Sequence, residues 1–344
     1  MNTEIFDLAV IRGLQKEIEL FIQNSSNSNK DTVFRKLAMD LFRYQVVNCA
    51  PYAEFCTLLG IGPDDVSDID GIPFLPVKFF KSKDVYSVKT PPEIVFTSSA
   101  TTGMIPSRHP VSDLSLYELS FLEAFRNFYG NPEDFNILAL LPSYLEREGS
   151  SLVYMAERLI KESKSEYSGF YLYNFDNLAD NLIKLRESSK KTILLGVSFA
   201  LVDFASSFNI NFPELIIMET GGMKGRGKEM SREEIHNIIK GAFGVEKVHS
   251  EYGMAELLSQ AYSYGDGVFS TPHWMKFLLR DFTNPLKILN DSEIGGLNII
   301  DLSNVNSCSF IETEDIGVKK AGNLWKIPGR ITNSELRGCN LLLG

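Results

Sequence analysis

The sequence lacks several features that would assign it to a common class of protein. It holds no apolar run near the roughly 18 residues that span a bilayer, and no basic, apolar leader opens it. It also has no excess of positive charge, because 34 Lys and Arg stand against 44 Asp and Glu for a net charge of -10. We therefore expect a cytoplasmic protein that neither spans a membrane nor binds nucleic acid.

Common motifs of catalysis and of metal binding are missing as well. The four cysteines form no CxxC pair and no Cys/His pattern of a metal site, so we expect reduced thiols. Neither a GxSxG elbow nor an HExxH pair occurs, and none of the four histidines has an evident nucleophile partner. The sequence thus offers no obvious catalytic dyad, and its chemistry must rest on other groups.

Length and apolar periodicity indicate the fold class. The chain has 344 residues, enough for about two domains. Residues 1–90 show helical apolar spacing over 4–22 and 32–47, which predicts a helical segment packed on the rest. Residues 91–265 alternate strands with helices, and 266–344 carry short strands and a tail. The fold class is therefore α/β, with mixed or parallel sheets, crossover helices and a small antiparallel β subdomain.

The alternation predicts individual elements. Strands are expected at 136–141, 170–173, 192–197, 215–218 and 247–249, then at 274–280, 286–289, 297–301, 310–312 and 324–327. Helices are expected at 151–163, 177–188 and 231–243. In such folds ligands gather at loops that leave the strand ends, so polar motifs after strands are the candidate sites.

Five hydroxyl side chains crowd one loop after a strand expected at 94–96. A helix is expected from Leu114, capped by Ser112 or Asp113. Hydroxyls and backbone N–H groups bind phosphates, and glycine lets the backbone approach them. A phosphate site is one interpretation, and a Ser/Thr-rich surface turn is the other. The loop residues are Thr97, Ser98, Ser99, Thr101, Thr102 and Gly103.

A glycine-rich loop follows the strand expected at 215–218. Gly222 to Lys228 has the GxxxxGK spacing of a P-loop, but Glu229 stands where a P-loop has Ser or Thr for Mg²⁺. That carboxylate would also repel phosphates. Three interpretations stay open: a P-loop, a turn at Gly221 and Gly222 that contacts a nucleotide in another way, and a plain mobile loop.

A third motif, His249–Glu256, runs from a strand end through a turn at Gly253. We expect Glu256 to begin an apolar helix. Its carboxylate is a candidate ligand for Mg²⁺ bound against phosphate oxygens. It is otherwise a first-turn acid that the helix dipole favours.

The fourth feature pairs an acidic turn with a later Gly-Arg. Asp315 lies in Glu312–Gly317, and Arg330 ends Pro328–Arg330. An Asp accepts hydrogen bonds from the vicinal hydroxyls of a sugar, and an Arg donates to them. Both segments are also typical of ordinary turns, so the residues alone leave the choice open.

The order of these four motifs resembles that of the adenylate-forming superfamily of acyl-CoA synthetases, luciferases and related ligases. A Ser/Thr/Gly loop is followed by a Gly-Gly turn, a Tyr-Gly-x-x-Glu motif, a Thr-x-Asp and a Gly-Arg. The chain is more similar still to the acyl-protein synthetase (LuxE-like) branch, the fatty-acid-activating component of bacterial fatty acid reductase. The stretches that carry this likeness are Leu141–Arg147, Ser250–Glu256 and Arg337–Asn340, within a resemblance that starts at about residue 70.

The resemblance implies a role for each motif. Thr97–Gly103 would grip the β- and γ-phosphates of ATP, Glu256 would bind Mg²⁺, and Asp315 with Arg330 would hold the ribose hydroxyls. A substrate carboxylate would attack the α-phosphate to give acyl-AMP and pyrophosphate. This reaction needs positioning and charge neutralisation more than acid–base groups. The residues implied for the adenine and acyl-adenylate pocket are Gly221, Gly222, Tyr252 and Gly253.

The chain departs from the superfamily pattern in three places. Arg108 stands near the position of the usual loop lysine, and Ala255 replaces a Thr whose hydroxyl meets the α-phosphate. Only fourteen residues follow Arg330, so the lid domain and its catalytic lysine are expected to be absent or vestigial. Members of the LuxE-like branch take the acyl group on a cysteine near the C-terminus. Cys339 is that candidate, with Arg337 nearby to favour its thiolate, or else it is an inert cysteine.

Taken with the resemblance, the sequence predicts an ATP- and Mg²⁺-dependent acid–thiol ligase that activates a carboxylic acid, with a fatty acid as first choice. The acyl group would pass to Cys339, or to an acceptor protein, a carrier protein or CoA, and a homo-oligomer is compatible with this interpretation. Three alternatives remain. They are an acyl-CoA or aryl-CoA ligase of the phenylacetate-CoA ligase type, a P-loop NTPase that makes ADP, and a non-catalytic binding protein.

Overall fold

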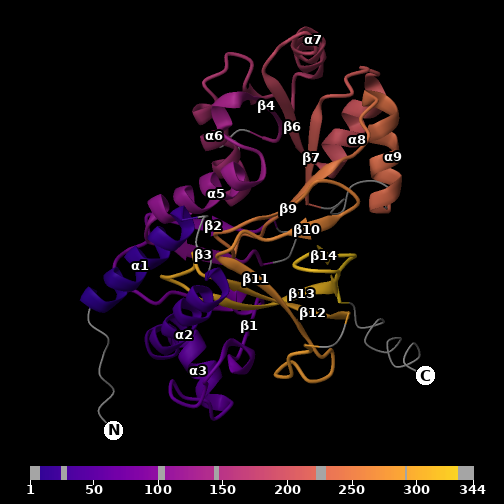
Figure 1. Cartoon of the computed structure of the whole chain (residues 1–344). Helices are drawn as coiled ribbons and strands as arrows, with labels where there is room; N and C mark the ends of the chain where they lie inside the picture. Colours follow the sequence, from indigo (N-terminus) through magenta and orange to yellow (C-terminus); the bar gives the residue numbers. More distant parts are fainter. Residues whose placement is uncertain are drawn as a thin grey trace, which may run out of the picture.

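The chain folds around one long mixed sheet. The helices of the N-terminal segment lie beside its lower half, and later helices surround its upper half (Figure 1). Within the part described, no helix is both long and apolar enough to cross a bilayer. The computed structural model describes residues 8–24, 29–99, 105–142, 147–221, 230–290 and 293–331.

The N-terminal helices are tied to the far end of the sequence. The fully buried Gln45 donates to Asn304 O at 2.8 Å and accepts from the Ser309 N–H at 2.8 Å. This segment therefore packs against the later strands. The helix predicted at 32–47 is confirmed, and that at 4–22 is confirmed from residue 8 on, since residues 4–7 lie outside the described part. The elements of this segment are α1 (Leu8–Gln23), α2 (Lys30–Asn48), α3 (Ala50–Leu58), a 3₁₀ turn at Ile69–Gly71, β1 (Leu75–Pro76) and α4 (Phe79–Ser82).

Five parallel strands form one half of the sheet. They are β4 (Phe135–Leu140), β5 (Gly169–Phe170), β6 (Lys191–Val197), β7 (Ile216–Thr220) and β8 (His249–Tyr252). The helices around them are α5 (Leu114–Phe128), α6 (Ser151–Ser163), α7 (Phe175–Leu185), α8 (Ser198–Ser207) and α9 (Arg232–Phe243), with a 3₁₀ turn at Pro132–Asp134.

These strands lie in the order β5–β4–β6–β7–β8, with every neighbouring pair parallel. Every residue of β4 is buried because helices cover both faces of the sheet. Ile137 and Ala139 pack in the core that includes α5 and α6, whereas Leu138 and Leu140 pack in the core with α7, α8 and α9. The apolar runs that predicted these strands are thus explained by two-sided burial.

Capping side chains set the helix bounds. Ser150 Oγ accepts from the Val153 N–H where α6 begins, and Ser231 forms a capping box with Glu234 at the start of α9. Gly244, with a φ of 71°, ends α9. The helices predicted at 151–163, 177–188 and 231–243 are therefore confirmed within a few residues. Helix α8 was not predicted; it starts directly after β6 with no side-chain cap hydrogen bond.

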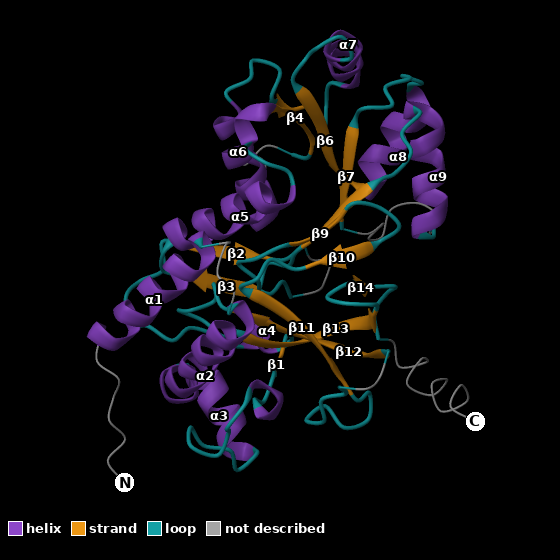
Figure 2. Cartoon of the chain, viewed as in Figure 1, coloured by secondary structure: helices purple, strands orange, loops and turns teal. Residues whose placement is uncertain are grey.

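The other half of the sheet is antiparallel and continues from β8 (Figure 2). Its strands are β9 (Ala261–Ser263), β10 (Val268–Ser270), β11 (Met275–Arg280), β12 (Ile294–Asp301), β13 (Phe310–Lys319) and β14 (Trp325–Lys326). β1 pairs in parallel with β13. A separate hairpin is formed by β2 (Ile94–Thr97) and β3 (Arg108–Val111).

The predicted fold class is confirmed: a sheet with crossover helices is joined to an antiparallel part. Both parts share a single 12-stranded sheet. The division of the chain at residues 90 and 265 stays a prediction, and residue 265 lies in the turn between the paired strands β9 and β10. The proposed absence of a lid concerns residues beyond 331, which lie outside the described part.

One predicted strand, at 286–289, does not form. Only a single bridge joins Ile288 to Arg280 there. The Asp281 carboxylate accepts from the Thr283 N–H at 2.8 Å and so closes a turn that competes with an extended strand. The segment instead meets the end of β11 through two backbone hydrogen bonds, Asp281 N–H to Lys287 O and Leu289 N–H to Leu279 O, and the prediction of a strand is wrong.

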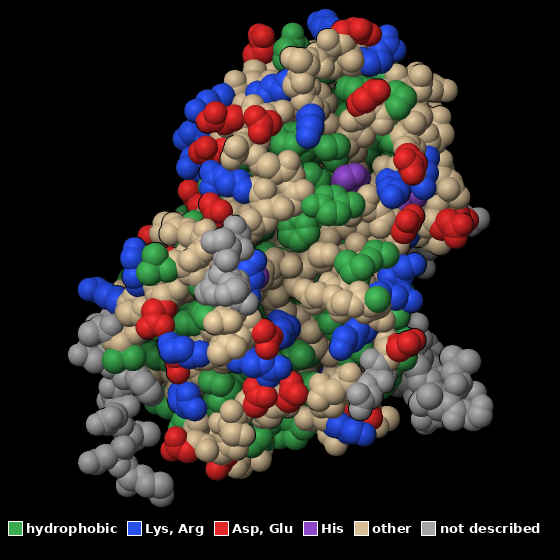
Figure 3. Space-filling view, viewed as in Figure 1, with side chains coloured by type: hydrophobic (Ala, Val, Ile, Leu, Met, Phe, Trp, Pro, Cys, Tyr) green, Lys and Arg blue, Asp and Glu red, His purple; other side chains and the backbone are tan. Residues whose placement is uncertain are grey.

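Charged side chains of both signs are interspersed on the face seen in Figure 3. Exposed pairs such as Arg35 with Asp68, at 2.7 Å, contribute little to stability, on the order of 1 kcal/mol or less. This face therefore presents no broad area of one charge.

Candidate active site

The carboxyl ends of β7 and β8 lie side by side, because the two strands pair in parallel over their last residues. Gly221 follows β7, while Tyr252 ends β8 and Gly253 comes after it. The structure therefore brings these three predicted pocket residues to one edge of the sheet, where ligands bind in folds of this kind. Gly222, the fourth, lies outside the described residues.

Tyr252 connects this edge to the antiparallel half. Its hydroxyl donates to Asp315 Oδ2 at 2.7 Å, and Arg330 Nε lies 3.6 Å from Asp315 Oδ1. The backbones of Asp315 and Arg330 also form an antiparallel bridge. Burial, and then the Asp315 charge, raises the pKa of Tyr252 well above its ordinary value, so the hydroxyl stays a donor. A hydrogen bond and an ion pair thus join Tyr252, from the third motif, to Asp315 and Arg330, from the fourth.

The hydroxyl-rich loop is a hairpin loop between β2 and β3. The strand predicted at 94–96 and the helix from Leu114, capped by Asp113, are confirmed. The return strand β3 between them was not predicted. Ser98 closes the base of the loop, since its N–H donates to Ser107 O at 3.1 Å and its Oγ accepts from the Ser107 N–H at 2.9 Å.

Thr97 fixes the hairpin to the segment before α6. Its N–H donates to Gly149 O at 2.7 Å, and an open hollow of about 460 Å³ lies beside it, lined also by Ile94 and Val95. Ser99 is the last described residue before the loop tip. The remaining predicted loop residues lie outside the described part; they are Thr101, Thr102 and Gly103.

Arg108 begins β3 opposite Thr97, at the base of the same hairpin. Its side chain is 56% exposed, and its Nε lies 4.0 Å from Asp84 Oδ1. An ion pair this long and exposed holds the guanidinium only weakly. Arg108 is therefore available to an anionic ligand at the loop.

The helix predicted to begin at Glu256 does not form. Residues 253–260 make turns that lead into β9, which pairs antiparallel with β8. The buried Asp301 carboxylate accepts from the Leu258 N–H at 2.9 Å and from Ser259 Oγ at 2.6 Å. These distant contacts fix an irregular backbone where local spacing favoured a helix. The prediction is wrong, and a first-turn acid at a helix dipole is excluded as the role of Glu256.

Glu256 is buried in this turn, at 4% exposure, and its carbonyl accepts from Asn304 Nδ2 at 2.9 Å. Within the part described, no group of three or more His, Cys, Asp and Glu side chains is placed to hold a metal ion. Mg²⁺ is commonly held by one or two carboxylates together with substrate phosphates and water. The Glu256 carboxylate is therefore a candidate ligand for Mg²⁺ delivered with a phosphate, and this role stays a prediction.

Sequence reasoning missed Glu251, a buried acid one residue before Tyr252. Thr220 Oγ1 donates to Glu251 Oε2 at 2.7 Å, and burial raises the pKa of Glu251 to about 7. A Cβ at Gly253 would lie 2.5 Å from Glu251 Oε1, so glycine makes room for this carboxyl. The signal available in the sequence was an acidic residue, Glu251, in a short strand that holds no other Asp, Glu, Lys or Arg.

A second missed acid, Glu219, lies in β7 two residues before Gly221. Its Oε1 is 3.1 Å from Arg232 Nε, and its Oε2 accepts from Ser198 Oγ at 3.0 Å. Burial opposes the ionisation of Glu219, but His236 Nε2, 3.4 Å from its Oε1, and the charge of Arg232 outweigh it and lower its pKa. Ser198 Oγ also lies 2.5 Å from Gly221 O, so one hydroxyl contacts both the buried acid and the residue that follows β7.

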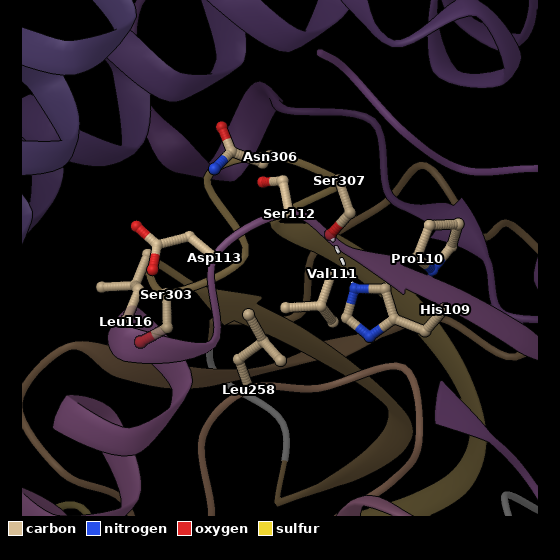
Figure 4. Close-up of a pocket in the computed structure, with 10 residues that line it drawn as sticks. All are labelled: His109, Pro110, Val111, Ser112, Asp113, Leu116, Leu258, Ser303, Asn306 and Ser307. Atoms are coloured by element: carbon tan, nitrogen blue, oxygen red, sulfur yellow. Dashed lines mark hydrogen bonds between the residues drawn. The ribbon is translucent and has the colours of Figure 1, made fainter. Parts of the chain in front are cut away.

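His109 joins the hairpin to the Glu256 turn and was also missed as a site residue. Its Nδ1 lies 2.8 Å from Ala255 O, and its Nε2 lies 2.9 Å from Ser307 Oγ, the contact drawn in Figure 4. The cavity beside it measures only about 10 Å³, room for about one water molecule. This cavity is too small for a substrate.

The described cysteines are poor nucleophiles. Cys49, Cys56 and Cys308 are free and buried, and burial raises the pKa of Cys49 to about 12 and that of Cys56 to about 11. A thiol reacts as the thiolate, which these positions disfavour at neutral pH. Cys339 and the possible P-loop, Gly222–Lys228, lie outside the described residues.

Two curated proteins align along most of the chain, although no protein-family model matches it. The chain is 23% identical to a long-chain-fatty-acid–luciferin-component ligase of Vibrio harveyi, over 99% of this chain and 93% of that protein. It is also 23% identical to a protein of the same name from Aliivibrio fischeri, over 89% of this chain and 86% of that protein. The similarity is therefore not confined to the motifs.

Solved structures of adenylate-forming ligases share the fold. An open conformation of 2-hydroxyisobutyryl-CoA ligase in complex with 2-HIB-AMP and CoA gives a TM-score of 0.64 at 13% identity, covering 88% of this chain and 71% of that one. A long-chain-fatty-acid-CoA ligase from Archaeoglobus fulgidus gives 0.50 at 16% identity, covering 74% and 55%. The predicted resemblance to the LuxE-like acyl-protein synthetases is therefore confirmed, and the chain shares its fold with adenylate-forming ligases.

Proposed function

We propose that this chain activates a carboxylic acid with ATP, releases pyrophosphate, and passes the acyl group from acyl-AMP to a thiol. The observation that carries the proposal is the Tyr252–Asp315–Arg330 group at the carboxyl end of β8. A carboxylate and a guanidinium held side by side match the hydroxyls of a ribose, because the first accepts hydrogen bonds and the second donates them.

The nucleoside would lie across the edge where β7 and β8 end. The ring of Tyr252 is held by the rings of Phe269 and Phe277, with centroids 6.0 and 5.8 Å away, and offers an aromatic wall beside Asp315. Gly221 has a φ of 68°, and among the described residues other than its chain neighbours no atom lies within 4 Å of the place its Cβ would take. Ligand atoms therefore have room to approach the backbone there, as a nucleotide requires.

The phosphates would reach the hairpin between β2 and β3. Ser98, Ser99 and the hydroxyls of the loop tip would donate hydrogen bonds to them, and Arg108 would offset their charge. Glu256 would hold Mg²⁺, which neutralises phosphate charge when bound. These donors and acceptors suit ATP and its metal ion, and none of them needs to move a proton.

Two displacements make up the reaction. A carboxylate oxygen of the acid attacks the α-phosphorus, and the bond to the bridging oxygen of pyrophosphate breaks as pyrophosphate leaves. A thiolate then attacks the acyl carbonyl, the acyl–oxygen bond breaks, and AMP leaves. The chain contributes position and electrostatic neutralisation to both steps. Cys339 or an external thiol is the acceptor.

The chain is an enzyme of the acid-ligase kind, as its curated relatives and structural neighbours are. The printed names of both relatives specify a long-chain fatty acid and a luciferin component, which makes a long-chain fatty acid the first substrate to test and a protein the first acceptor. An acyl-CoA ligase is the second candidate. The observation that favours it is the shared fold with 2-hydroxyisobutyryl-CoA ligase, solved with CoA bound.

Product analysis tests the proposal. The chain is incubated with Mg²⁺, ATP, a long-chain fatty acid and hydroxylamine. We expect AMP, pyrophosphate and an acyl hydroxamate, all dependent on the acid. ADP as the product would instead support a P-loop NTPase.

Intact mass then identifies the acceptor. We expect an acyl adduct on the wild-type chain that is lost in Cys339→Ser and kept in the matched variant Cys308→Ser. Acyl-CoA formation without an adduct would favour the CoA ligase.

A further inference from the structure

His109 is a fully buried histidine with a polar partner at each ring nitrogen. Ala255 O, 2.8 Å from Nδ1, only accepts, so the Nδ1 atom carries the hydrogen and donates it. The bare Nε2 therefore accepts from the Ser307 hydroxyl at 2.9 Å. Burial lowers the pKa of His109 to about 4, which keeps the ring neutral at physiological pH, and the two hydrogen-bond partners select the tautomer.

The ring connects two segments that lie far apart in the sequence. His109 pairs with Phe96 across the hairpin and so moves with the base of the hydroxyl-rich loop. Ala255 is the residue before Glu256, whose own carbonyl accepts from Asn304 at 2.9 Å. Two neighbouring carbonyls of the turn are thus held from opposite elements, one by the hairpin and one by the antiparallel half.

We propose that His109 is a positioning residue that fixes the distance between the phosphate-binding hairpin and the Glu256 carboxylate. This inference rests on the proposed function, because the two segments it joins are the ones that would hold the ATP phosphates and Mg²⁺. An adenylation step depends on such spacing, since a misplacement of about 1 Å can cost about 100-fold in rate.

A purely space-filling role makes a different prediction. The ring of Phe80 packs edge-on against His109 at 5.5 Å, so any smaller side chain leaves a gap and lowers stability. Such a role predicts that the larger Gln side chain is tolerated better than Asn, because it leaves a smaller gap. The hydrogen-bond geometry predicts the reverse order.

Two substitutions separate the two contacts. In His109→Asn the amide nitrogen takes the place of Nδ1 and can still donate to Ala255 O. In His109→Gln the amide oxygen takes the place of Nε2 and can still accept from Ser307, while the donor to Ala255 is lost. Ser307→Ala removes the other contact and leaves the His109–Ala255 hydrogen bond in place.

Pyrophosphate exchange with subsaturating ATP measures the effect. We expect kcat/KM for ATP to fall at least about 10-fold in His109→Gln and to stay within about threefold of wild type in His109→Asn and in Ser307→Ala. Comparable melting temperatures for the two His109 variants would show that the difference is not one of stability. Equal activity in the Asn and Gln variants would overturn the proposal.

A ligand-free measurement keeps the inference separate from the proposed function. In wild-type protein labelled with ¹⁵N-histidine, we expect His109 to show a protonated Nδ1 and a bare Nε2. Amide exchange at residues 254–258 should be faster in His109→Gln than in His109→Asn. The opposite tautomer, or equal exchange, would overturn the inference even if the His109 variants lose their fold or activity. Wild-type protein that exchanges no pyrophosphate with any acid would count against the proposed function alone.

Discussion

Replacing the ionisable Glu251 by glutamine should make the protein more stable than wild type at alkaline pH. The carboxyl is 7% exposed and receives a hydrogen bond from Thr220 Oγ1 at 2.7 Å. Burial raises its pKa from the ordinary 4.5 to about 7, so the fold favours the neutral form. Glu251→Gln keeps an acceptor oxygen for Thr220 and remains neutral at every pH, which isolates the effect of the charge.

The magnitude follows from the two pKa values. Below pH 4.5 the carboxyl is protonated in the folded and unfolded chains, and its stabilising contribution is fully present. As the pH rises from 4.5 to 7, the unfolded chain releases the proton while the folded chain retains it, so wild-type stability falls. The 2.5 pH units between 4.5 and 7 correspond to about 3 kcal/mol. Above pH 7 both states are ionised and the loss levels off.

Urea unfolding of wild type and Glu251→Gln at a series of pH values between 4.5 and 8.5 measures this effect. The difference in the free energy of unfolding should grow by about 3 kcal/mol in favour of the variant over this range. The exposed Glu246→Gln controls for the loss of one negative charge. A difference that does not change with pH would refute the assignment of Glu251 as a buried, neutral acid.

The remaining predictions concern the same strand end. Gly253→Ala should lower the free energy of unfolding by about 1–3 kcal/mol, because its Cβ would lie 2.5 Å from Glu251 Oε1. Its matched control, Gly241→Ala in α9, has nothing within 4 Å of the new Cβ and should stabilise by up to about 1 kcal/mol; thermal unfolding of the pair checks both. Asp315→Asn should raise KM for ATP about 10-fold or more with a smaller change in kcat, since a hydrogen bond to a charged group contributes about 1.5–3 kcal/mol. An unchanged KM would remove Asp315 from the nucleotide site.

Local sequence signals were sufficient where the chain's own chemistry sets the structure. The spacing of apolar residues over 151–163 and the serine before it gave α6 with its N-cap at Ser150. The apolar run of β4 reflects burial on both faces of the sheet, so the strand could be predicted without knowing which segments pack against it. Motif order singled out Asp315 and Arg330, the residues proposed for the nucleotide site, and the structure brings them together.

Long-range contacts account for what the sequence did not reveal. The Asp301 carboxylate accepts hydrogen bonds from Leu258 and Ser259 and so prevents a helix after Glu256. No sequence pattern near Glu256 predicts this distant partner. The acids Glu219 and Glu251 owe their environments to strands and helices that pair only in the folded chain. His109 likewise acquires its role from a carbonyl 146 positions later in the chain.

Pyrophosphate exchange tests the central claim most directly. The chain is incubated with Mg²⁺, ATP, labelled pyrophosphate and a panel of aliphatic and aromatic acids. We expect label to enter ATP only when a suitable acid is present, with the strongest exchange for long-chain fatty acids, and to decline sharply in Asp315→Asn at low ATP. No exchange with any acid, or exchange that does not depend on the acid, would contradict activation of a carboxylate as acyl-AMP.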